Sequence, residues 1–252
     1  NQSHCHSRMK PVLQHIFQLK RHYEQRPFFD HLRDERLTPR QRLAFLPCMA
    51  PFILAFGDLN RYVLRDEPTG DPYQAMVNAH SREDDHHWPW YLEDFSKLGH
   101  DSPQAPSDTL RFHYSDSTAV KRRLALRLAH LIWSATPVQR LAVIEAIEEA
   151  GNVLFALTAR LAAQYEAETG VELRYCGEFH FELESGHAMN NDHAELARIE
   201  LDEASRNWTL VAVSEVFSEF ADWTEELLRF TLALQEEQEA APPQVLALHA
   251  RV

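Results

Sequence analysis

The feature that most constrains the fold of this chain is a set of long segments in which apolar residues recur at intervals of three and four. In the segment from Asn207 onward these residues are Val213, Phe217, Phe220, Trp223, Leu227, Phe230 and Leu234. The spacing follows the 3.6-residue turn of an α-helix, so each such segment can bury one face against its neighbours. Only 7 of the 252 residues are glycine, and alternating β-branched runs are few. We therefore predict an all-α protein built as a multi-helical bundle.

Prolines and capping residues place the predicted helices along the chain. Proline is tolerated in the first turn of a helix, and Thr38 and either Ser117 or Thr118 can cap a helix start. We expect helices over residues 11–26, 39–65 with a kink at Pro47 or Pro51, 73–89, 118 to beyond 133, 137–165 and 207–234, with a short helical or irregular segment at 28–36 and a loop at 99–116. Residues 171–175 alternate and could instead form a strand. We expect one domain over residues 1–252, with loose ends at 1–10 and 240–252.

Charge and cysteine content narrow the classes of partner. The formal net charge is -13, which repels phosphate backbones and anionic membranes, so we expect no nucleic-acid or membrane partner. Cys5, Cys48 and Cys176 are odd in number and far apart, which argues against a disulfide framework. No apolar run approaches the roughly 20 residues of a membrane span, and the first residues are polar. We expect a cytoplasmic protein that could form a homodimer.

A stripe of metal-ligating residue types follows Gly177. His180, Glu184 and His187 are separated by four and three residues, so a helix brings them to one face. Two imidazoles and a carboxylate are good ligands for a divalent ion such as iron, manganese or zinc. With 15 histidines in the chain, a solvated polar face is the alternative interpretation.

A second stripe lies on the predicted helix that begins at Tyr73. His80, Asp84 and His87 fall on the same face as the apolar residues of this helix, whereas the neighbouring Glu83-x-x-His86 pair is out of phase. Burying these groups is costly unless they are paired or bound to a metal, so we predict metal ligands. The alternative is an acidic patch on the surface.

A third candidate ligand lies on the predicted helix 137–165. Glu148 falls among the apolar residues of its core face, whereas Glu145 and Glu149 project away from that face. Glu148 is therefore the predicted inward carboxylate. It could instead pair with an arginine or carry a proton.

These three sets together resemble the haem-oxygenase-like di-metal oxidases and oxygenases, a group that includes alkene-forming fatty acid decarboxylases. That family carries an acid and a histidine seven residues apart on one helix, a glutamate on a second helix and a His-x-x-x-Asp-x-x-His stripe on a third. The matching residues here are His87, Ala146-Ile147-Glu148, His180, Glu184 and His187. The resemblance spans residues 40–235 and implies the haem-oxygenase-like fold. It also implies a non-haem Fe(II) site, possibly dinuclear and with manganese as a possible substitute, that uses O2 to oxidise a small-molecule substrate.

The sequence departs from the family pattern at His80, which stands where the family has an acid. Two divalent ions would then have one carboxylate fewer to balance their charge, unless Asp84 replaces it. The same fold also includes thiaminase II and pyrroloquinoline-quinone synthase, so fold alone does not define the chemistry. We keep two alternatives, a thiaminase-II-like hydrolase with Cys176 or Cys48 as nucleophile and a non-catalytic ligand-binding protein.

Overall fold

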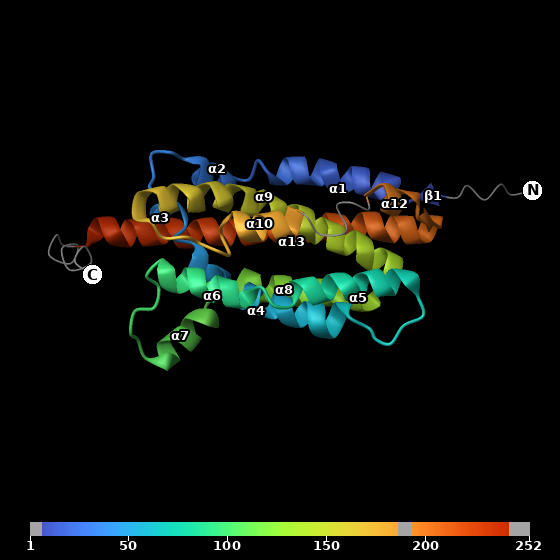
Figure 1. Ribbon diagram of the computed structural model, residues 1–252, viewed down its shortest axis with the longest axis horizontal. Helices are drawn as coiled ribbons and strands as arrows, with labels where there is room; N and C mark the ends of the chain where they lie inside the picture. Colours follow the sequence, from blue (N-terminus) through green and yellow to red (C-terminus); the bar gives the residue numbers. More distant parts are fainter. Residues whose placement is uncertain (1–6, 186–192, 242–252) are drawn as a thin grey trace, which may run out of the picture.

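The computed structural model describes residues 7–185 and 193–241, and Figure 1 shows an elongated helical bundle. The all-α prediction is confirmed. A short antiparallel pairing joins β1 to β2, with Ser7 opposite Leu201. In chain order the elements are β1 (Ser7–Arg8), α1 (Lys10–Tyr23), α2 (Pro27–Arg33), α3 (Pro39–Arg42), η1 (Leu46–Met49), α4 (Ala50–Asp58), η2 (Leu59–Leu64), α5 (Pro72–Asp84), α6 (Trp88–Lys97), α7 (Pro106–His113), η3 (Asp116–Thr118), α8 (Ala119–Ser134), α9 (Pro137–Thr169), α10 (Glu178–Ser185), α12 (His193–Arg198), β2 (Glu200–Leu201) and α13 (Glu203–Ala240).

Helices α9 and α13 run through the middle of the bundle and pack against each other. Helix α9 also contacts α1, α5 and α10, while α4 and α8 pack together in a second layer. A capping box of Thr136 and Gln139 begins α9, and Gly170 ends it with a left-handed backbone (φ 73°). Residues 141–150 are all buried, so the middle of α9 is enclosed on every side. Any polar residue there must find its partner inside the protein.

The apolar stretch 39–65 is more broken than the single kinked helix predicted. It passes through α3, the 3-10 helix η1, α4 and the π-helix η2. Pro47 and Pro51 each lie in the first turn of a new segment rather than within a helix, because proline lacks the N–H that an interior position needs. Pro39–Leu64 is long and apolar enough to cross a membrane by length and composition alone, which the sequence analysis did not anticipate. Its most apolar stretch of 18 residues is 56% buried inside the bundle, as in the core helix of a soluble protein.

Several predicted boundaries were wrong. Helix α5 ends at Asp84, before the predicted break, and His87 caps the start of α6. The predicted loop 99–116 contains helix α7, and α13 begins four residues before Asn207, after the cap Asp202. Residues 171–175 form no strand. The predicted loose start contains β1, and Met9 is buried.

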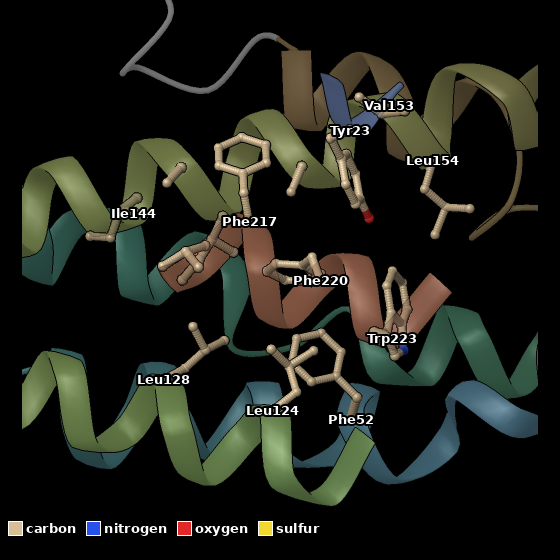
Figure 2. Packing of buried hydrophobic residues seen from close by; sticks show 14 of the residues in the cluster. Tyr23, Phe52, Leu124, Leu128, Ile144, Val153, Leu154, Phe217, Phe220 and Trp223 are labelled. Carbon is tan, nitrogen blue, oxygen red and sulfur yellow. The ribbon is translucent and has the colours of Figure 1, made fainter. Parts of the chain in front are cut away.

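The buried hydrophobic residues form a continuous core between the helical layers. Figure 2 shows side chains from α4, α8, α9 and α13 meeting there, among them Phe52, Phe220 and Trp223. The rings of Phe52 and Phe220 meet edge to face with centroids 5.8 Å apart, and the Phe220 and Trp223 rings do so at 5.5 Å. This aromatic trio forms one wall of the cavity described below.

The tight entry into α10 generates a testable prediction. A Cβ atom at Gly177 would lie 2.1 Å from the Leu173 carbonyl oxygen, whereas one at Gly70 would meet nothing within 4 Å. Because a backbone carbonyl cannot swing aside, we expect Gly177→Ala to lower the free energy of unfolding by about 1–3 kcal/mol. Gly70→Ala should change it by less than about 0.5 kcal/mol. Chemical denaturation of both variants tests this, and equal stabilities would contradict it.

Candidate metal site

The structure gathers the described candidate residues from four parts of the chain. All six are buried: His80 and Asp84 on α5, His87 at the start of α6, Glu148 on α9, and His180 and Glu184 on α10. The remaining predicted ligand, His187, lies outside the described residues. Among the described residues, the six side chains supply two groups of possible metal ligands.

The first group joins His87, His180 and Glu184, and is called the triad below. The Nε2 atom of His180 lies 3.3 Å from Nδ1 of His87 and 3.1 Å from Oε1 of Glu184. The His87 Nδ1 and Glu184 Oε1 atoms are 3.4 Å apart. Donor atoms bound at about 2.1 Å to one metal ion are separated by about 3.0–3.4 Å. The triad therefore has the donor types and the spacing that one divalent ion needs.

The hydrogen bond on the far side of the His180 ring strengthens this fit. Its Nδ1 atom lies 2.9 Å from the Tyr175 carbonyl oxygen, which can only accept, so Nδ1 must donate. A neutral His180 then presents the lone pair of Nε2 to the Glu184 carboxylate. A lone pair and a carboxylate at 3.1 Å repel each other unless a cation or a proton lies between them. Metal-bound histidines are commonly oriented by such a bond to a carbonyl oxygen.

The second group consists of His80, Asp84 and Glu148. The His80 Nε2 atom lies 2.9 Å from Asp84 Oδ2 and 2.9 Å from Glu148 Oε1. Burial alone would lower the pKa of His80, but Asp84 and Glu148 outweigh it and raise the pKa well above its ordinary value. His80 thus sits between two carboxylates that favour its charged form.

His87 reaches the site by a route that the sequence analysis did not predict. Helix α5 ends at Asp84, so the phase of that helix does not orient His87. Instead, His87 stands at the N-cap of α6, and its ring stacks on Trp90 with centroids 4.6 Å apart. The ring of His180 meets the His87 ring edge-on at 5.0 Å. Aromatic packing therefore positions the His87 ring, which does not lie within a helix.

A buried carboxylate outside the site holds the segment that precedes α10. Asp94 is fully buried, and its two oxygens accept hydrogen bonds of 2.7 Å from the backbone N–H groups of Arg174 and Cys176. Burial raises the pKa of Asp94, while these two donors oppose that rise. The same segment supplies the carbonyl oxygen of Tyr175 to His180. Asp94 therefore helps to position the His180 ring without touching it. Asp94 is some 80 residues earlier in the chain, and no sequence pattern pointed to this contact.

A cavity opens directly beside both groups. Its volume is about 70 Å³, and Asp84, His87, Glu148, His180 and Glu184 line it. The rest of the lining is mostly apolar and includes Met49, Phe52, Ile53, Phe56, Ile147, Leu154, Phe155, Tyr175, Phe220 and Trp223. An apolar cavity with a few convergent polar groups is typical of a small-molecule site.

Glu145 and Glu149 point away from this cavity, as predicted, but both are buried rather than exposed. Glu145 Oε1 lies 3.0 Å from Nε2 of His193 on α12, and Glu149 Oε2 accepts a 2.6 Å bond from Lys20 on α1. Together with His193 the two carboxylates form a further group of possible metal ligands. Lys20 already supplies a positive charge there, so we assign no metal to it.

Comparison with solved structures supports the fold, whereas comparison with known sequences finds no match. No protein-family model matches the sequence, and no curated protein matches it either. Among solved structures, the chain is similar to a domain of unknown function with a heme oxygenase-like fold from Shewanella denitrificans OS217. The TM-score is 0.64 at 14% sequence identity, over 91% of this chain and 95% of that one. The predicted haem-oxygenase-like fold is therefore confirmed, and the similarity extends to the fold alone.

The His193–Glu145 contact predicts a pH-dependent stability. The hydrogen bond to Glu145 raises the pKa of His193 above its ordinary value of 6.5, although partial burial opposes this, Glu149 adds to it and Lys20 reduces it. A raised folded pKa means that the contact stabilises the fold fully below the ordinary pKa and is lost as pH rises through the folded value. We expect His193→Gln to lower the free energy of unfolding by about 1 kcal/mol near pH 6, and by less near pH 9.

Urea denaturation at the two pH values measures this difference. The exposed His130, for which His130→Gln should have little effect at either pH, provides the control. An effect of His193→Gln that does not change with pH would contradict the assignment.

Proposed function

We propose that this protein is a metal-dependent oxidoreductase that uses non-haem iron and O2 to oxidise a small molecule. The observation that carries the proposal is the triad, in which His87, His180 and Glu184 have mutual donor distances of 3.1–3.4 Å and the lone pair of His180 is turned toward its partners. Two imidazoles and one carboxylate with open positions are the ligand set of many non-haem Fe(II) oxygenases. Manganese has similar ligand preferences and is the alternative ion.

The iron, when bound, would supply the activation of O2 and the redox chemistry. The chain's own residues hold and insulate it. Glu184 would contribute the negative charge, the Tyr175 carbonyl orients the His180 ring, and the Trp90 ring supports His87. The apolar lining of the cavity excludes water from the reacting molecule and strengthens the electrostatic contacts within.

A second ion at His80, Asp84 and Glu148 would make the site dinuclear, as the family resemblance implies. The geometry supports this second ion less than the first. Both carboxylates contact His80 and favour its charged form, and a cation could bind there only when His80 is neutral. We therefore propose one ion at the triad, with the second group acting as its charged neighbour. The cytoplasmic location, the single domain, the homodimer and the absence of nucleic-acid and membrane partners stay predictions.

The alternative of a thiaminase-II-like hydrolase requires a reactive cysteine, and the described thiols do not suit that role. Cys48 and Cys176 are buried, and neither lines the cavity. Burial raises the pKa of both thiols, most strongly at Cys176, whereas a nucleophilic cysteine needs a lowered pKa. Cys5 lies outside the described residues. A purely ligand-binding protein would share the cavity but would have no need of the triad geometry.

Metal binding tests the proposal directly. We expect anaerobic incubation with Fe(II) or Mn(II), followed by desalting and elemental analysis, to give about one ion per chain and a raised melting temperature. Glu184→Gln keeps the shape of the side chain but removes its charge, so metal affinity should fall by about tenfold or more. Glu182→Gln changes an exposed carboxylate on the same helix and should have no effect. A wild-type protein that retains no metal, or that loses none in Glu184→Gln, would contradict the triad assignment.

Oxygen consumption separates the oxidase from the hydrolase. We expect Fe(II)-loaded protein to consume O2 faster than free Fe(II), because the triad holds the ion with open positions. His87→Ala and His180→Ala should abolish this activity, whereas His86→Ala, which removes the exposed neighbouring imidazole, should not. Cys48→Ala and Cys176→Ala should leave it intact. Turnover of thiamin that survives chelators and is lost with either cysteine would favour the hydrolase instead.

A further inference from the structure

We propose that the cavity binds a neutral, largely apolar molecule that carries a carbonyl or similar hydrogen-bond acceptor, and that the Tyr175 hydroxyl donates a hydrogen bond to it. This inference rests on the proposed function, because the bound molecule would be the one oxidised beside the triad.

Tyr175 is a buried side chain whose polar end lacks a protein partner. It is 4% exposed and lines the cavity, and its hydroxyl, which is not fully enclosed, makes no hydrogen bond to any of the described residues. The neighbouring Tyr91 shows the usual behaviour, since its hydroxyl donates a 2.6 Å bond to the Leu46 carbonyl oxygen. Buried tyrosine hydroxyls normally find such a partner, and leaving one unpaired is costly. A ligand in the cavity would supply the missing acceptor.

The surroundings of the Tyr175 ring fix the position of this donor. The ring stacks on His180 with centroids 4.5 Å apart and planes at 29°, and it meets Phe155 edge-on at 5.4 Å. The Tyr91 ring packs against it at 5.5 Å. A ligand acceptor held by Tyr175 would therefore lie beside a residue of the triad, with little freedom to shift. This would place the polar end of the ligand nearest to the proposed metal.

The aromatic wall of the cavity indicates that the rest of the ligand is apolar. Phe52, Phe220 and Trp223 form that wall, and the indole N–H of Trp223, which is 3% exposed, has no acceptor in the described part of the chain. That N–H group is fully enclosed, so this wall offers the ligand apolar ring surface.

In the metal-free protein, the charged residues that line the cavity disfavour an anionic ligand. Among the described residues, no lysine or arginine lines the cavity. Four carboxylates do line it: Asp84, Asp85, Glu148 and Glu184. A carboxylate or phosphate group of a ligand would meet like charges and no cationic side chain. The cavity therefore favours a neutral carbonyl compound, such as a ketone, an ester or an amide with an apolar body.

A matched pair of probes tests the proposal in metal-free protein. Acetophenone and ethylbenzene have nearly the same shape and apolar surface, but only acetophenone carries an acceptor. Ligand-observed NMR titration of the full chain gives both dissociation constants. We expect wild-type protein to bind acetophenone about fivefold more tightly, as one added net hydrogen bond implies. Tyr175→Phe keeps the ring and should abolish this preference while leaving the affinity for ethylbenzene unchanged.

Tyr91→Phe is the matched control, because it removes a neighbouring buried hydroxyl that does not line the cavity. It should retain the preference for acetophenone. Equal binding of the two probes by the wild type, binding of neither probe, or an undiminished preference in Tyr175→Phe would each overturn the proposal. The measurement needs no metal, so a failure of metal binding would overturn the proposed function while leaving this result to stand by itself.

Discussion

The burial of carboxylates on α9 is the constraint on which the rest of the structure depends. The helix is enclosed along residues 141–150, yet Glu145, Glu148 and Glu149 all lie within that stretch. An unpaired buried charge costs several kcal/mol, so each carboxylate requires a positive partner from another helix. Those partners are His193 at 3.0 Å, His80 at 2.9 Å and Lys20 at 2.6 Å. Three helices are thus tied to α9 by charge as well as by packing.

The candidate site depends on these contacts through its geometry. Helix α5 carries His80 against Glu148, and this contact sets the position of the turn that delivers His87. From the other direction, Asp94 holds the segment that leads into α10, and the close approach at Gly177 sets the angle at which that helix begins. The triad therefore forms where two separately anchored segments meet. This explains how a loop-like turn and a short helix can hold donor atoms within 3.4 Å of one another.

Much of the fold could be predicted from sequence, and the reason is periodicity. The apolar spacing in α9 and α13 indicated long buried helices, and the phase of α9 correctly separated Glu148 from Glu145 and Glu149. Periodicity says nothing about what faces the other side of a buried helix, so the partners Lys20 and His193 were missed. It also fails where a helix breaks. His87 was assigned by the phase of a helix that ends three residues earlier, and it reaches the site through the cap of α6 instead. Asp94 acts through contacts that are distant in sequence, which leave no local pattern.

The charges around the two groups argue for an asymmetric site. In the second group, one imidazole lies between two carboxylates, and the raised pKa of His80 shows that these carboxylates favour its charged form. In the triad the ratio is reversed, because two imidazoles share one carboxylate, and the bond from His180 Nδ1 to a carbonyl oxygen turns Nε2 toward Glu184. Two imidazoles with one carboxylate are a ligand set for a divalent ion, whereas a pair of carboxylates that favours a charged imidazole between them is less suited to one. His80 and its two carboxylates would then form a charged neighbour of the triad. The neighbouring triad would keep the single position suited to a metal.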